Sequence, residues 1–87
     1  MHEKWKILVL LLGAIAKEKG ITHWDITIET GIMRQYITDI FNLKHAPGIK
    51  HLLKITDALG LDIYIETRDG EKLNWSKLKR EAMKNYK

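Results

Sequence analysis

Four histidines and eleven acidic residues are the side chains of this sequence best suited to catalysis or metal binding, and there is no cysteine. Without cysteine the chain has no thiol nucleophile, disulfide or thiolate ligand for zinc. His2, His23, His45 and His51 lack metal-ligand spacings such as H-E-x-x-H. The sequence has no glycine-rich phosphate loop, no G-x-S-x-G elbow and no acid pair spaced for general acid–base work. We therefore predict no enzyme activity, no metal site and no cofactor.

Composition predicts one small globular domain. The 87 residues are 45% hydrophobic and 30% charged, with a net charge of +4. Residues 77–87 hold five basic side chains and one acid, so residues 1–76 are neutral, with ten of each sign. The basic segment is either a phosphate-contacting arm or a solvated helix face. Bulk charge therefore supports nucleic-acid binding only weakly.

The N-terminal segment predicts a helix from about Glu3 to Lys19 that stops at Gly20. Its core-facing stripe is predicted to contain Trp5, Leu8, Leu12, Ile15 and Ala16. Further apolar residues lie on the other faces, so we expect a second side of this helix to be covered, by the C-terminal segment or by a partner subunit.

The same apolar run imitates a secretion signal, because Lys4 and Lys6 precede it and Ala14-Ile15-Ala16 ends it. The ten residues of the run are too few to span a membrane as a helix. Cleavage after Ala16 would also remove the first helix, which the following segment needs as a scaffold. We expect a cytoplasmic protein without a membrane partner.

Residues 20–62 predict three further helices at a distinctive spacing. Thr22 and Asp25 form a short variant of a capping box, followed by a helix over His23–Thr30. Gly31 supplies a left-handed turn before a second helix at about 34–42. After the break at residues 46–48, a helix is predicted from 49 to 59, ending at Gly60.

This stretch closely resembles the helix-turn-helix of phage repressors and Cro proteins, the XRE family. The resemblance implies a mainly α, four- to five-helix repressor-like fold, with a DNA-binding head over residues 1–60. It also implies that the second helix of the motif enters the major groove while the preceding helix crosses the DNA backbone.

Residue roles follow from that resemblance. Arg34 and Gln35 take the first exposed positions of the recognition helix, and Thr38 and Asp39 lie one turn later on the same face. Arg can bind guanine and Gln adenine through two hydrogen bonds each, so these four are the predicted base readers. The predicted phosphate contacts are Thr22, His23, Tyr36, Asn42, Lys44 and His45. The Tyr36 ring lies either along the sugar–phosphate edge or against the preceding helix.

Four positions depart from the family pattern. His23 replaces the usual glutamine, and Leu43 replaces a common glycine, which predicts a different local turn. Met33 replaces the usual Ser or Thr cap, which leaves the first amides of the recognition helix without a side-chain acceptor. Asp39 is an acid where a neutral or basic reader is usual; it either accepts from cytosine N4 or pairs with a protein side chain.

Beyond residue 60 the apolar period changes from helical to alternating. We predict a strand over residues 61–67, a hairpin turn at Asp69-Gly70 and a final helix capped by Ser76. Residues 61–87 are thus the predicted dimerisation element of the same domain, because a lone hairpin is marginal in water. The predicted dimer contacts are Leu61, Ile63, Tyr64, Ile65, Leu73 and Trp75. The final helix packs either on its own subunit or on a partner.

The function expected from these features is that of a homodimeric, sequence-specific regulator, a repressor that binds double-stranded DNA. One alternative is an antitoxin that combines such a head with a surface for a toxin. The other is a protein-interaction module whose helix-turn-helix no longer reads DNA, an interpretation favoured by the neutral body, Met33 and Asp39.

Overall fold

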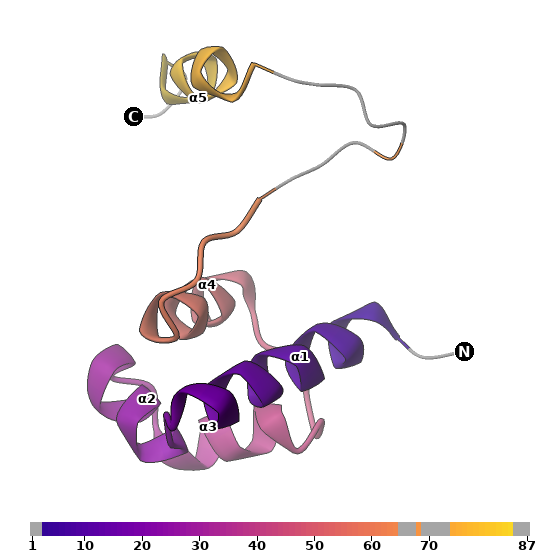
Figure 1. The fold of residues 1–87 in the computed structure, drawn as a ribbon, viewed down its shortest axis with the longest axis vertical. Helices are drawn as coiled ribbons and strands as arrows, with labels where there is room; N and C mark the ends of the chain where they lie inside the picture. The colour runs from indigo at the N-terminus through magenta and orange to yellow at the C-terminus, as the bar shows by residue number, and fades with distance from the viewer. Residues whose placement is uncertain (1–2, 65–67, 69–73, 85–87) are drawn as a thin grey trace.

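A computed structural model describes residues 3–64, 68 and 74–84. This part of the chain forms five helices: α1 (Lys4–Lys19), α2 (His23–Thr30), α3 (Arg34–Phe41), α4 (Ile49–Ala58) and α5 (Trp75–Lys84). Figure 1 shows α1 to α4 gathered into one head, with α5 apart from it. The prediction of a mainly helical fold is confirmed.

Glycines end α1 and α4 in the same way. Gly20 and Gly60 both have left-handed backbones, with φ of 70° and 72°. The next amide turns back into the helix: Ile21 N–H donates to the Ala16 carbonyl at 2.8 Å, and Leu61 N–H donates to that of Thr56 at 2.9 Å. These are Schellman closures, which satisfy carbonyls that the helix end leaves unpaired. Both predicted helix ends are confirmed.

The capping box predicted for α2 is present. Thr22 Oγ1 accepts from the Asp25 amide at 3.1 Å, and the Asp25 carboxylate accepts from the Thr22 amide at 2.9 Å. Gly31, with φ of 75°, then ends α2 and donates its amide to Thr27. The chain is thereby turned so that Ile32 enters the core and α3 starts at Arg34.

A single apolar core holds the head together. The buried residues are Val9, Leu12, Ala16, Ile26, Ile32, Ile37, Ile40, Ile55 and Leu59. The stripe predicted for α1 is partly wrong, because Val9 is buried where Leu8 was expected and Leu8 is 40% exposed. Since α1 is apolar on nearly every face, hydrophobic periodicity could not distinguish these two residues.

The predicted strand is not supported. Residues 61–64 form neither helix nor strand, whereas residues 65–67 and most of the proposed hairpin, including Ile65, Asp69-Gly70 and Leu73, lie outside the described residues. Leu61 packs against the core of its own head, and Ile63 and Tyr64 are exposed. Alternation of apolar residues gives a strand only where another strand supplies hydrogen-bond partners.

The final helix begins one residue before the expected cap. Asn74 Oδ1 accepts from the Lys77 amide at 3.0 Å, so Asn74 rather than Ser76 caps α5. Asn is among the preferred residues at this position. Within the described part of the chain, no helix combines the length and apolar character needed to cross a membrane.

Candidate nucleic-acid interface

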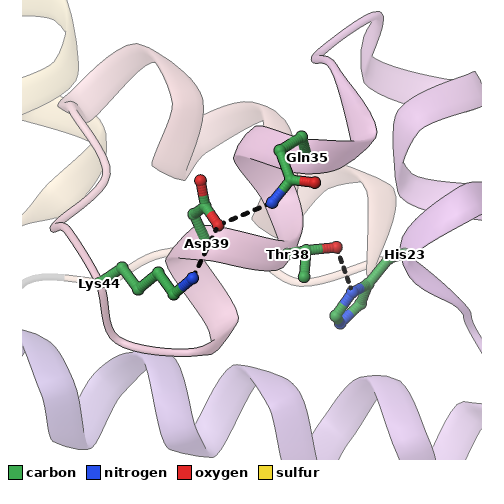
Figure 2. Close-up of polar contacts among 5 residues, drawn as sticks. All are labelled: His23, Gln35, Thr38, Asp39 and Lys44. Carbon is green, nitrogen blue, oxygen red and sulfur yellow. Dashed lines mark hydrogen bonds and ion pairs between the residues drawn. The ribbon is translucent and has the colours of Figure 1, made fainter.

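One side of α3 anchors the helix and the other faces away from the head. Ile37 and Ile40 are buried at spacings that place them on a common side. The opposite side carries Gln35, Thr38, Asp39 and Asn42, with Arg34 at its edge at the start of the helix. The four predicted base readers therefore share one helix surface with the predicted phosphate contact Asn42. Figure 2 shows three of them beside His23 of α2 and Lys44 of the next turn.

Asp39 is the shared partner of two polar contacts on this face. Its Oδ1 accepts a hydrogen bond from Gln35 Nε2 at 2.9 Å and lies 3.8 Å from Lys44 Nζ (Figure 2). The Asp39 side chain is 22% exposed, against 65% for Lys44. Asp39 thus pairs with protein side chains in the free protein, which is one of its two predicted alternatives, and the contact with cytosine N4 stays a prediction. Two predicted DNA contacts, Gln35 and Lys44, thus already share a protein partner.

Thr38 is linked to the start of α2. Its Oγ1 lies 3.2 Å from His23 Nδ1, and the His23 ring stacks on Phe41 with centroids 5.1 Å apart and planes inclined by 17°. His23 is therefore half-buried against α3. Its contacts fix the approach of the two helices of the motif, so the His23 side chain contributes to the packing between α2 and α3.

The Tyr36 ring lies between two imidazoles. Its centroid is 4.8 Å from that of His45 and 4.8 Å from that of His51. The ring thus connects α3 with the following turn and with α4. Neither of the two positions predicted for Tyr36 included these histidines, which are brought together only by the packing of α4.

Arg34 is exposed and, unlike Gln35, makes no hydrogen bond or ion pair with any described residue. Before it, Met33 is the N-cap of α3, 74% exposed and without a side-chain cap, so the prediction for Met33 is confirmed. Arg34 can therefore move toward a ligand without breaking a polar contact of the head.

Leu43 shapes the turn that carries Lys44 and His45. Its φ is 62°, in the left-handed region that suits glycine, so the turn takes a glycine-like backbone despite the leucine side chain. That conformation costs a non-glycine residue roughly 1–2 kcal/mol. Leu43 packs against the core, which offsets the strain.

A negative charge lies where α2 was expected to contact phosphate. Asp25 is exposed beside Thr22 and His23. The hydrogen bond from the Thr22 backbone, and then that of the Thr22 side chain, lowers the pKa of Asp25 below its ordinary value. This carboxylate stays ionised at neutral pH and would repel a phosphate nearby. The capping pattern was visible in the sequence, but its electrostatic consequence for the site was missed.

The helix α5 carries a net charge of +3, from four basic side chains and one acid. Its exposed basic residues are Lys77, Lys79, Arg80 and Lys84, and Lys84 lies 3.8 Å from Glu81. The head itself offers Arg34 and Lys44 near the outward side of α3.

Among the described residues, no group of three His, Asp or Glu side chains could hold a metal ion. Comparison of the chain with models of known protein families, with curated proteins and with solved structures found no match.

Proposed function

We propose that this chain binds double-stranded DNA by inserting the outward side of α3 into the major groove, and that it acts as a transcriptional repressor. The observation that supports this most directly is the position of α3. The helix follows a capped α2 and a glycine turn, is anchored by Ile37 and Ile40, and presents hydrogen-bonding side chains on its free side. A helix that contacts base edges in the major groove must be anchored on one side and carry hydrogen-bonding side chains on the other. The resemblance to repressor-type helix-turn-helix proteins leads to the same proposal.

In this proposal Arg34 is the first base reader. It is exposed at the helix start and has no polar partner to give up among the described residues. Its guanidinium matches O6 and N7 of guanine, a contact worth about 1–3 kcal/mol of base discrimination.

Gln35 reads the neighbouring base only by exchanging partners. Its Nε2 donates to Asp39 in the free protein, and the same amide would donate to adenine N7 in the complex. Because one hydrogen bond replaces another, the net gain from Gln35 is smaller than from Arg34. Lys44 likewise leaves Asp39 for a phosphate oxygen, which fixes the register of the helix on the duplex.

The proposed active form is a homodimer, which would contact two half-sites about one helical turn, ~34 Å, apart. Two heads on one duplex multiply the modest affinity of each head. They would also require an operator with two-fold symmetry.

Salt dependence of duplex binding tests the proposal. A fluorescently labelled mixed-sequence duplex is titrated with protein at several salt concentrations, and anisotropy gives the affinity. We expect affinity to fall steeply with salt, since binding releases counterions from the phosphates. The Arg34→Ala, Gln35→Ala double variant should bind more weakly. Lys54→Ala, which removes the same net charge from an exposed site on α4, should bind like the wild type. No binding at low salt would contradict the proposal.

A protein-interaction role, in which the helix-turn-helix no longer reads DNA, is a second candidate. Trp24 and Ile28 lie one turn apart on α2 and are 54% and 65% exposed. Exposed apolar pairs of this kind suit a protein partner better than a nucleic acid. In that case the duplex titration would give no signal, and the double variant on α3 would leave partner binding unchanged.

A further inference from the structure

The side of α1 that faces away from the core is strongly apolar. Ile7, Leu10 and Leu11 are each 55–57% exposed, and Leu8 is 40% exposed. Ile7, Leu10 and Leu11 lie on the other side of the helix from Val9, Leu12 and Ala16, which the head buries. Leu8, four residues before Leu12, lies at the boundary between the two sides. α1 runs along one side of the head, and no described element covers this second side (Figure 1). An apolar surface of this extent on a small soluble domain marks an interaction site.

The order of residues along this side is complementary to itself when reversed. Leu11 lies at the centre, with Ile7 one turn before it and Ile15, which is half-buried, one turn after it. Lys4 stands at the N-terminal end of the same side and Glu18 at the C-terminal end. Both charged residues are exposed, and neither has a polar partner among the described residues.

A second copy of α1 in antiparallel orientation would cover these apolar side chains and pair the two charged ones. Around a two-fold axis at Leu11, Ile7 lies opposite Ile15 of the partner, and Lys4 lies opposite Glu18 of the partner. In a two-fold interface every contact occurs twice, so one sequence supplies two apolar clusters and two ion pairs. A parallel arrangement would instead place Lys4 against Lys4 and Glu18 against Glu18, which is repulsive.

The apolar face of α5 is a further candidate partner for this surface, but it fits less well. α5 exposes Leu78 and Met83, but four basic side chains flank them against one acid. On α1 those basic residues would lie near Lys4 and Lys17, so α5 matches the charge pattern of α1 poorly.

We propose that the outward side of α1 is a homodimer interface, in which two α1 helices pack antiparallel about Leu11 with Lys4–Glu18 ion pairs at both ends. This locates the dimer contact in the head, away from residues 61–75 where the alternating pattern had suggested it. The proposal concerns self-association alone and does not rest on DNA binding.

Molar mass in solution tests it, measured by sedimentation equilibrium on the full chain without DNA. The wild type should sediment as a dimer. Leu11→Glu brings two like charges together at the axis, so its dimer dissociation constant should rise at least ~100-fold. Leu53→Glu is the matched control: Leu53 is an exposed leucine, 48% accessible, on α4, and this variant should remain dimeric. Circular dichroism verifies that both variants stay helical.

Charge exchange tests the orientation. Lys4→Glu and Glu18→Lys should each raise the dissociation constant by about tenfold, because each replaces two attractions by two repulsions. The combined Lys4→Glu, Glu18→Lys variant should restore the wild-type value. A monomeric wild type, an unaffected Leu11→Glu variant or a failure of the combined variant to restore dimerisation would overturn the proposal.

Discussion

Asp39 places a carboxylate at the centre of the proposed reading surface, where it accepts from Gln35 and pairs with Lys44. An acid at this position opposes the approach of DNA in two ways. It repels the phosphates, and it occupies two side chains that DNA would use. However, its hydrogen bond also holds the Gln35 side chain in one orientation before DNA binds. In the proposed complex, Asp39 therefore lowers the overall affinity for DNA but keeps the side chains of the reading surface ordered.

Replacing Asp39 should strengthen DNA binding. Asp39→Ala removes the repulsion and frees both partners, so affinity for a mixed-sequence duplex should rise roughly tenfold at low salt. Asp39→Asn keeps the size and the hydrogen bond to Gln35 but removes the charge, and it should give most of the same gain. Anisotropy titration measures both variants. A fall in affinity with Asp39→Asn would instead mean that the carboxylate contacts a base directly.

Asp25 makes the stability of the head depend on pH. Its folded-state pKa is lowered by hydrogen bonds from Thr22, so the carboxylate stabilises the fold at pH values above its ordinary pKa. That contribution is lost as pH falls through the lower folded-state value. The difference in melting temperature between wild type and Asp25→Asn should thus be present at pH 7 and shrink in strongly acidic buffer. A difference that stays constant with pH would show that the charge of Asp25 is irrelevant.

At the scale of elements, local signals predicted the ends of α1, α2 and α4, whereas the cap of α5 is Asn74 rather than Ser76. These boundaries depend on backbone geometry within a few residues of the capping box Thr22–Asp25 and of three glycines, Gly20, Gly31 and Gly60. The local sequence therefore contains the information that determines them. The side of α1 that is buried could not be predicted in the same way. Its apolar residues surround the helix, and only the positions of the other helices select Val9 over Leu8.

In the candidate site, too, contacts determined by local sequence were predictable and contacts that depend on tertiary packing were not. The shared outward side of α3 was predictable, because helix periodicity determines it. The contact of His51 with Tyr36 was not, because it depends on the packing of α4. The alternation after residue 60 was misleading, since a strand requires a partner that the local sequence does not specify.

The turn between α2 and α3 offers a direct test of the backbone argument. Gly31 has φ of 75°, and an added Cβ would meet nothing within 4 Å, so steric contact with the rest of the head plays no part. Gly31→Ala should destabilise the head by about 1–2 kcal/mol through backbone strain alone. Gly31→Asn should cost less, because Asn tolerates this conformation. Urea unfolding followed by circular dichroism ranks the two variants, and equal costs would contradict the strain argument.

For the whole molecule, the proposed roles fall on separate regions of the chain. The head supplies the outward side of α3 and the apolar side of α1, whereas the net positive charge lies in residues 77–87. Residues 1–60 hold eight basic and six acidic side chains, a net charge of only +2, against +4 for residues 77–87. This distribution suits a protein whose specificity comes from a few directed contacts and whose general attraction to DNA comes from elsewhere.

Selection of bound duplexes from a randomised DNA pool at near-physiological salt tests the central claim most directly. The Arg34→Ala, Gln35→Ala variant and the Lys54→Ala control are carried through the same rounds. The wild type and the control should enrich one two-fold-symmetric site with a guanine or adenine at conserved half-site positions, and the double variant should not. No enrichment by the wild type, or equal enrichment by the double variant, would contradict the assignment of α3 as a sequence-reading helix.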